Sequence, residues 1–217
     1  MSDEKFLAYE GILLRENAKY NLTAITDPAE IRQKHFADSL ALLDAYEIPQ
    51  GAKVLDIGSG AGFPGVPLKI ARPDLRLTLL DSTAKKAEFL RKLGEELGIA
   101  LTVLCARAEE AAHDVALRES FDLVTSRAVA ALPLLCELCL PFVRVGGVFV
   151  AYKGTRARTD VELKAAKRAI GMLGGGEARV ISEATAYGER TLVIIRKAAN
   201  TPEDYPRNYG AMLKKPI

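Results

Sequence analysis

Short apolar runs alternate with amphipathic stretches along most of the chain after residue 50. The runs are rich in Val, Leu and Ile and occupy residues 53–57, 76–80, 101–105, 121–125 and 147–152. Runs of this length, separated by helix-like spacing, indicate strands joined by helices. Strands connected in this way pair in parallel through right-handed crossovers. The pattern predicts an α/β protein with a mostly parallel sheet.

The last two apolar runs are connected differently. Residues 178–183 and 191–196 have strand character, and residues 184–190 between them are too few for a crossover helix. We expect an antiparallel hairpin, which completes a seven-stranded sheet whose last strand is antiparallel. Parallel strands followed by such a hairpin form the Rossmann-like layout of class I methyltransferases, whereas dinucleotide dehydrogenases usually continue with parallel strands.

Helical spacing precedes the first strand. Asp27, Pro28 and Glu30 supply an N-cap, a proline for the first turn and a capping-box acid. We expect two helices joined by residues 20–26. The chain thus divides into an N-terminal helical extension (residues 1–50), a main domain (51–199) and an irregular basic tail (200–217).

A glycine-rich segment follows the strand at 53–57 directly and reads Gly58-Ser59-Gly60-Ala61-Gly62-Phe63-Pro64-Gly65. Glycines allow positive φ and a close approach to a ligand, and the following helix offers free N–H groups. Counted from Gly58 the spacing is G-x-G-x-G, typical of methyltransferases; counted from Gly60 it is the dinucleotide form G-x-G-x-x-G. We favour the first, because Gly58 begins where the strand ends. A tight turn without a ligand is the third interpretation.

Acidic residues follow the next two strands. Asp81 comes about 20 residues after the glycine loop, where a carboxylate can accept both hydroxyls of a nucleotide ribose. The alternative role of Asp81 is to cap the helix expected at 82–97. After the third strand, the Ala108 N–H and the Glu109 carboxylate are placed to meet an adenine ring.

The fourth strand ends in Thr125-Ser126-Arg127-Ala128. Enzymes that methylate exocyclic amines of adenine or cytosine usually have an acid or amide, two prolines and an aromatic residue there, and this chain has none of them. A Pro-Cys pair for covalent attack on a pyrimidine is also missing at this point.

Composition restricts the possible partners. The 30 Lys and Arg against 28 Asp and Glu give a formal net charge of +2, so nucleic-acid binding can rest only on local patches. Basic residues cluster twice, and either cluster is a phosphate-binding surface or a solvated one: Lys153, Arg156, Arg158, Lys164, Lys167 and Arg168; Arg207, Lys214 and Lys215.

The cysteines and the chain ends bear on the compartment. Cys105, Cys136 and Cys139 are an odd number, typical of reduced thiols and of a cytoplasmic protein. Cys136 and Cys139 lie in an apolar helical stretch without a second pair, so we expect core packing and no metal site. The charged N-terminus excludes a secretory signal, and the apolar stretch at 128–143 is too short and too interrupted to span a membrane.

Taken together, these motifs resemble one family, the bacterial small-subunit ribosomal RNA methyltransferase G, or glucose-inhibited division protein B, family. The resemblance covers nearly the whole chain and includes the glycine loop. Its other stretches are Asn21-Leu22-Thr23, His35 to Leu40, Asp81-Ser82 with Lys85-Lys86 and Phe89-Leu90, Arg107 to Glu109, Ser126-Arg127-Ala128, Lys153-Gly154 and Tyr205-Pro206-Arg207.

The resemblance implies methyl transfer from S-adenosylmethionine to N7 of a guanine in 16S ribosomal RNA, guanine 527 in the family. It implies cytoplasmic action, without a metal, on the RNA, the small ribosomal subunit or an assembly intermediate, and we expect a monomer. The cofactor contacts that we expect are Gly58, Gly60, Phe63, Asp81, Ala108, Glu109 and Arg127, and the catalytic residues are Arg127 and Lys153.

Guanine N7 has an in-plane lone pair and loses no proton on methylation, so alignment replaces a general base. Arg127 and Lys153 are expected to hold the guanine and its phosphates. Three other functions stay open from the residues: a small-molecule methyltransferase, a nicotinamide-dependent (NAD) oxidoreductase that uses the Gly60 spacing, and a non-catalytic RNA-binding protein.

Overall fold

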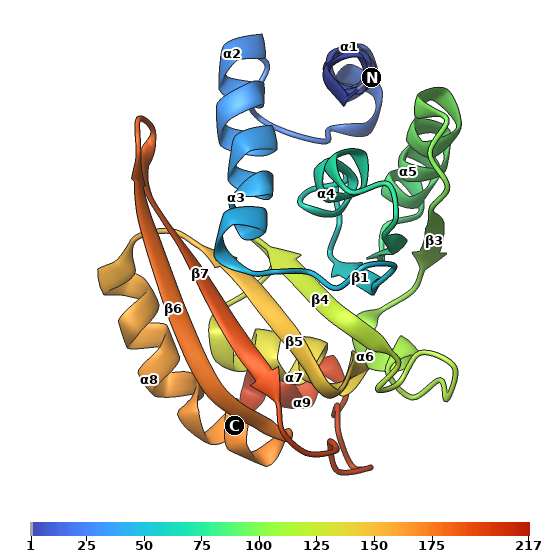
Figure 1. Cartoon of the computed structure of the whole chain (residues 1–217). Helices are drawn as coiled ribbons and strands as arrows, with labels where there is room; N and C mark the ends of the chain where they lie inside the picture. The colour runs from blue at the N-terminus through green and yellow to red at the C-terminus, as the bar shows by residue number, and fades with distance from the viewer. Residues whose placement is uncertain (1) are drawn as a thin grey trace. The chain divides into compact units, whose positions relative to one another are not determined.

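The computed structural model describes residues 2–217 as an α/β protein that divides into two compact units, one ending at Ala106 and one beginning at Arg107 (Figure 1). The first unit contains α1 (Ser2–Tyr20), α2 (Pro28–Ile31), the π-helical η1 (Arg32–Ala37), α3 (Asp38–Ala45), β1 (Lys53–Ile57), α4 (Gly65–Ala71), β2 (Arg76–Asp81), α5 (Ala84–Leu97) and β3 (Thr102–Cys105). The second contains α6 (Ala108–Ala111), β4 (Phe121–Arg127), α7 (Leu132–Cys139), the 3₁₀ turn η2 (Leu140–Phe142), β5 (Val143–Lys153), α8 (Arg156–Met172), β6 (Gly175–Thr185), β7 (Gly188–Lys197) and α9 (Tyr209–Lys214).

The predicted seven-stranded, mostly parallel sheet is confirmed. Its strand order is β3-β2-β1-β4-β5-β7-β6. In the first unit β1 pairs with β2 and β2 with β3 in parallel. In the second unit β4 and β5 are parallel, whereas β7, the last strand along the chain, is antiparallel to both β5 and β6. The predicted terminal hairpin therefore forms.

The N-terminal segment forms the two predicted helical parts, separated by residues 21–27. Asp27 caps α2 as expected, since its side chain accepts a hydrogen bond from Glu30 N and Pro28 occupies the first turn. The second part runs continuously from α2 through η1 into α3. The sequence did not predict its π-helical centre, a geometry that occurs frequently at functional sites.

Helix α5 shows why the first unit is compact. Its spacing places apolar residues on one buried stripe that includes Phe89, Leu90 and Leu93. Each such large side chain contributes about 1.5–3 kcal/mol on burial. The opposite, polar face of α5 contacts α1 through ion pairs.

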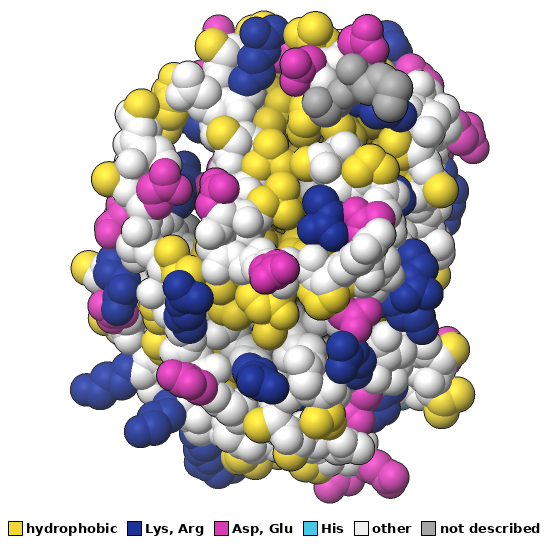
Figure 2. All heavy atoms as spheres, viewed as in Figure 1, with side chains coloured by type: hydrophobic (Ala, Val, Ile, Leu, Met, Phe, Trp, Pro, Cys, Tyr) yellow, Lys and Arg dark blue, Asp and Glu magenta, His cyan; other side chains and the backbone are white. Residues whose placement is uncertain are grey.

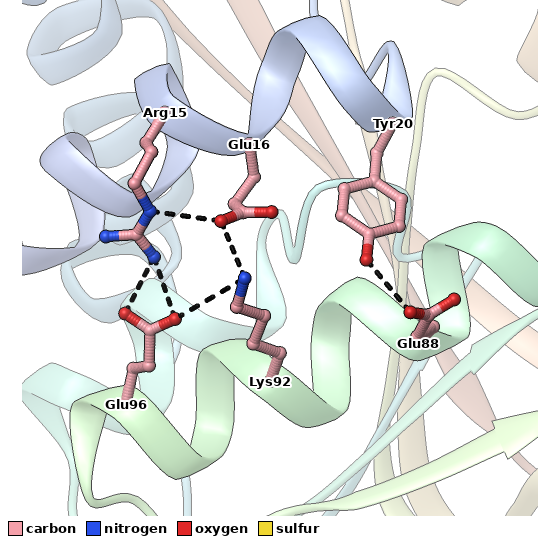
Figure 3. A network of polar contacts seen from close by, with 6 residues as sticks. All are labelled: Arg15, Glu16, Tyr20, Glu88, Lys92 and Glu96. Carbon is pink, nitrogen blue, oxygen red and sulfur yellow. Dashed lines mark hydrogen bonds and ion pairs between the residues drawn. The ribbon is translucent and has the colours of Figure 1, made fainter.

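Figure 3 shows the network between α1 and α5. Arg15 binds both carboxylate oxygens of Glu96 at 2.8 Å, and Lys92 Nζ lies 2.7 Å from Glu16 Oε1. Hydrogen bonds from Lys92 and Arg15 lower the pKa of the Glu16 carboxyl. Each exposed pair contributes little alone, but the shared carboxylates fix the rotation of α1 against α5.

The core of the second unit contains a lysine. Lys197 on β7 is fully buried, and its ammonium donates to the Leu140 carbonyl at 2.7 Å and to the Thr201 hydroxyl. Glu119 completes the site with a carboxylate oxygen 3.2 Å from Nζ. Burial lowers the pKa of Lys197 to about 8, although the attraction of Glu119 opposes the shift.

The tail after residue 199 was expected to be irregular, and the structure places the short helix α9 within it. Backbone carbonyls of the tail bind one side chain: Arg118 donates to the carbonyl oxygens of Thr201, Pro202 and Tyr205 at 2.8–3.0 Å. Arg207 forms a bidentate pair with Glu137. The tail therefore belongs to the second compact unit.

The buried Lys197 makes stability depend on pH in a defined direction. Between the folded pKa of about 8 and the unfolded value of 10.5, the unfolded chain binds more protons, so the free energy of unfolding rises with pH in this window. From pH 7 to pH 9.5 we expect a gain of about 2 kcal/mol relative to Lys197→Met, measured by urea unfolding. The exposed Lys164→Met is the control and should follow the unmodified chain. Parallel pH profiles for Lys197→Met and the unmodified chain would contradict the assignment.

Candidate functional site

Three glycines shape the loop after β1. Gly58, Gly60 and Gly62 have φ of +70°, +57° and +101°, backbone conformations that residues other than glycine rarely adopt. Gly65 has no positive φ; it starts α4 and is required for packing, because a Cβ there would lie 2.7 Å from Leu79 Cδ2. The loop conformation thus depends on the spacing counted from Gly58, which favours the G-x-G-x-G interpretation.

Contacts from outside the loop hold its backbone. The fully buried Tyr9 of α1 donates its hydroxyl to the Ala61 carbonyl at 2.5 Å. A Cβ on Gly62 would lie 2.6 Å from the same hydroxyl oxygen, so Tyr9 and Gly62 require each other. Asp56 at the end of β1 accepts from Gly65 N at 3.2 Å, which places a carboxylate at the start of α4.

Asp81 joins the end of β2 to the glycine loop. One carboxylate oxygen accepts from Gly60 N at 3.0 Å and the other from Thr83 N at 2.9 Å. Helix α5 begins at Ala84 with Thr83 as its N-cap residue, so Asp81 is not the helix cap that was considered as its alternative role. A carboxylate has about four acceptor positions, which leaves capacity for the two ribose hydroxyls.

Phe63 closes the glycine loop and is buried in an aromatic cluster of the first unit. Its ring stacks against His35 of η1 with centroids 4.5 Å apart and against Tyr9 with centroids 5.3 Å apart. Phe36 approaches from the same π-helical segment at 5.9 Å. The position of the Phe63 ring is therefore set by the N-terminal helices.

The second unit contributes the other expected cofactor contacts. Ala108 and Glu109 start helix α6 and are buried. Arg107 donates from Nε to Glu109 Oε1 at 3.0 Å, and its guanidinium lies over the Tyr209 ring of α9 at 4.6 Å. The hydrogen bond from Arg107 orients the acid that was expected to meet the adenine, and it raises the pKa of Arg107.

Arg127 and Lys153, the two expected catalytic residues, lie at the carboxyl ends of neighbouring parallel strands. Arg127 ends β4 and is in register with Tyr152, next to Lys153 at the end of β5. Ala128 directly after Arg127 has φ of +58°, a strained conformation for a residue with a Cβ. Such strain persists only where surrounding contacts fix the backbone.

Lys153 fixes the backbone two residues after Ala128. Its ammonium donates to the Ala130 carbonyl at 2.8 Å and pairs with Glu162 of α8 at 2.7 Å. The same Glu162 oxygen accepts from Leu132 N at 2.8 Å. Burial opposes ionisation of Glu162, but hydrogen bonds from Lys153 and Leu132 lower its pKa below the ordinary value. Lys153 therefore binds both the loop that follows Arg127, at Ala130, and helix α8, at Glu162.

Each of the two basic clusters contains residues that pair with acids. Arg156 pairs with Asp160 at 2.7 Å, and Arg207 is engaged by Glu137. Lys164, Lys167 and Arg168 are exposed on α8. On the face shown in Figure 2, basic and acidic side chains are interspersed rather than gathered into one basic field.

Cys136 and Cys139 pack in the core, as predicted, since both are fully buried in α7. Burial raises the pKa of the Cys136 thiol to about 12, so the thiolate that binds metals or attacks disulfides is not populated near neutral pH. Within residues 2–217, no group of three or more His, Cys, Asp or Glu side chains is arranged to hold a metal ion.

Sequence reasoning missed several residues that shape these sites. Tyr9, Glu162 and Tyr209 contact the glycine loop, Lys153 and Arg107, respectively. Tyr9 occupies an ordinary apolar helical position, and nothing in its spacing indicates a hydrogen bond. An acidic partner such as Glu162 could have been predicted, because Lys153 was expected at the end of a buried strand and a buried lysine requires a nearby acid.

The strand order, the glycine loop and the acid after β2 together define the class I S-adenosylmethionine-dependent methyltransferase fold. A solved O-methyltransferase from Bacillus cereus, in complex with SAH, has the same fold: the TM-score is 0.60 at 18% identity, over 87% of this chain and 90% of that chain.

The family follows from sequence comparison. The profile of the rRNA small subunit methyltransferase G (GidB) family matches residues 2–192. The ribosomal RNA small subunit methyltransferase G of Moorella thermoacetica is 50% identical over 213 residues, 97% of this chain and 88% of the relative. That of Lachnoclostridium phytofermentans is 45% identical over 217 residues, 99% of this chain and 89% of the relative. The chain belongs to the rRNA small subunit methyltransferase G family. The predicted family is confirmed, and the oxidoreductase alternative is not favoured.

The glycine loop allows a matched pair of substitutions. Gly60→Ala introduces a Cβ into open space, with Gly58 O at 3.8 Å, and should cost only the strain of a left-handed alanine, about 1–2 kcal/mol. Gly62→Ala carries at least this strain, because its φ of +101° lies beyond the left-handed α region. It also places a Cβ 2.6 Å from Tyr9 Oη and 2.9 Å from Val66 Cγ2, so it should cost about 1–3 kcal/mol more in urea unfolding. Tyr9→Phe in the Gly62→Ala background should recover part of that loss. Equal losses at the two glycines would contradict the Tyr9 contact.

Proposed function

We propose that this protein transfers the methyl group of S-adenosylmethionine to N7 of a guanine in 16S ribosomal RNA. Family membership supports the reaction class, and the observation that carries the cofactor assignment is the hydrogen bond from Gly60 N to Asp81. It joins the loop whose glycines have positive φ to a carboxylate suited to ribose hydroxyls. This arrangement within the first unit supports the proposed cofactor cradle.

The residues present suit this cofactor. A Cβ at Gly60 would meet only Gly58 O, at an ordinary contact distance of 3.8 Å, so the loop backbone is not crowded there, and the Asp81 carboxylate retains acceptor capacity. The further contacts that we propose are Gly58, Phe63, Ala108, Glu109 and Arg127. S-adenosylmethionine supplies an electrophilic methyl group on its sulfonium.

The chain's own residues then have to align the base. N7 carries an in-plane lone pair and no proton, so no side chain has to act as a general base. We assign to Arg127 the orientation of the guanine, through hydrogen bonds to O6 or to the RNA backbone. Lys153 supports it by fixing the loop from Ala128 to Leu132, through the Ala130 carbonyl and Glu162.

The proposal extends to the substrate and the compartment. We propose that the enzyme acts as a monomer in the cytoplasm on 16S RNA, the small subunit or an assembly intermediate. In the described part of the chain, residues 2–217, no helix has the length and apolarity to cross a membrane. The basic residues that we propose as phosphate contacts are the exposed Lys164, Lys167 and Arg168 of α8 and Lys214 and Lys215 of the tail, because within residues 2–217 no acidic side chain pairs with them as Asp160 does with Arg156.

Calorimetric titration with S-adenosylmethionine and, separately, with NADH tests the cofactor. Binding of S-adenosylmethionine alone is expected, and binding of NADH alone would overturn the assignment. Transfer of a labelled methyl group to unmodified 16S RNA and to small subunits that lack the modification then identifies the substrate. Binding without transfer to either would favour the small-molecule alternative.

Arg127→Ala should lower kcat by about 100-fold, in the range found for removal of one group that orients or stabilises the reacting centre. The free energy of unfolding should change little, because Arg127 ends a strand and is only partly buried. Arg179→Ala, on the exposed part of β6, is the control and should retain full turnover. Undiminished transfer by Arg127→Ala would remove Arg127 from the reaction.

A further inference from the structure

Asn17 locks the turn that follows α1. Its side-chain oxygen accepts from Leu22 N at 2.8 Å and from Thr23 N at 2.9 Å, and its amide donates to the Thr23 carbonyl at 2.9 Å. Asn21 at the turn has φ of +50°. Three hydrogen bonds of one side chain fix the turn after α1, and they thereby fix the position of Thr23.

Thr23 in turn orients His35. The Thr23 hydroxyl accepts from Ile25 N at 3.1 Å and lies 2.9 Å from His35 Nε2. A hydroxyl has one donor and two acceptor positions, so it can serve both partners at once. His35 lies in the π-helical η1, and the Ser39 hydroxyl donates to its carbonyl at 2.5 Å. The imidazole is therefore held at its outer nitrogen and at its backbone.

His35 transmits this orientation to the glycine loop. Its ring lies almost parallel to Phe63, with an interplanar angle of 23° and centroids 4.5 Å apart, in the range of favourable aromatic stacking. An apolar side chain of similar size would fill the same space, but it would have no partner in Thr23. The polar contact specifies the plane of the ring, and the plane of the ring specifies the plane of Phe63.

We propose that Asn17, Thr23 and His35 form a positioning chain that presents Phe63 to S-adenosylmethionine. Tyr9 holds the loop backbone at Ala61, and this chain holds the side chain two residues later. The Asn-Leu-Thr turn and the π-helical segment are thereby parts of the cofactor site. The inference rests on the proposed function, because it takes Phe63 as a cofactor contact.

Thr23→Val removes the hydroxyl and keeps the shape of the side chain. The hydroxyl bonds both His35 Nε2 and Ile25 N; loss of the bond that orients His35 corresponds to about 1 kcal/mol, so the Kd for S-adenosylmethionine, measured by calorimetry, should rise about fivefold. Thr23→Ser retains the hydroxyl and should restore the Kd. S-adenosylhomocysteine should show the same loss, because the effect lies in how the site is shaped and not in the reacting methyl group. Thr185→Val, at the exposed β6–β7 hairpin, removes a hydroxyl that donates to Gly188 O and should leave the Kd unchanged.

A double-mutant cycle separates this chain from a general effect on folding. His35→Phe keeps the stacking and removes the nitrogen, so Thr23→Val should raise the Kd much less in that background, where only its hydrogen bond from Ile25 N is lost. Additive losses would overturn the proposal, as would a Thr23→Val loss that Thr23→Ser does not restore, or an unchanged Kd in Thr23→Val and His35→Phe. If the unmodified chain does not bind S-adenosylmethionine, the proposed function fails instead, which is a distinguishable result.

Discussion

The glycine loop depends on the buried hydrogen bond from the Tyr9 hydroxyl to the Ala61 carbonyl. Glycines with positive φ lose much conformational entropy on ordering, and they contribute no side chains that could offset this loss. The stabilisation must therefore come from outside the loop. It comes from α1 through Tyr9, from β1 through Asp56 and from β2 through Asp81. Since α1 is itself fixed against α5 (Figure 3), the N-terminal helices are part of what makes the loop rigid.

Two lysines have a comparable structural role in the second unit. Lys197 binds the Leu140 carbonyl and Glu119, and Lys153 binds the Ala130 carbonyl and Glu162. In both cases an ammonium cross-links backbone and acid, fully buried at Lys197 and partly buried at Lys153. The electrostatic consequence is that these cations are neutralised internally. The charge available to attract RNA is therefore smaller and more local than the number of basic residues suggests.

The sequence predicted the sheet because strand character depends on local apolar runs and on connection length. The hairpin at the end of the sheet followed from a connection too short for a helix, and the capping role of Asp27 followed from a motif that is complete within four residues. The π-helical segment was not predictable, because it depends on how His35 and Phe36 pack against Phe63. Partners far apart in sequence were missed for the same reason.

The sequence predicted the loops that form the candidate site, but it did not predict the side-chain contacts that fix their backbone. The glycine spacing indicated a ligand-binding loop, because glycines mark the positions where the backbone takes positive φ. Asp81 was identified from the number of residues that separate it from this loop. The Arg107–Tyr209 contact joins residues on α6 and α9, which no local pattern connects. Lys153 was recognised as important from the family resemblance, yet its partners depend on where α8 places Glu162.

The proposed reaction at guanine N7 would make such supporting contacts decisive. With no proton to remove, the chain cannot gain rate from a base with a matched pKa; the rate depends on how closely the methyl group and the lone pair are held in line. A displacement of about 1 Å costs such a reaction roughly 100-fold. Residues that set the plane of Phe63 or the strained backbone at Ala128 therefore influence alignment as directly as residues that contact the ligand. In a protein of this kind, catalytic power would reside largely in the rigidity of the loops, and that rigidity is supplied by the buried Tyr9 and by the partly buried Lys153 and Asn17.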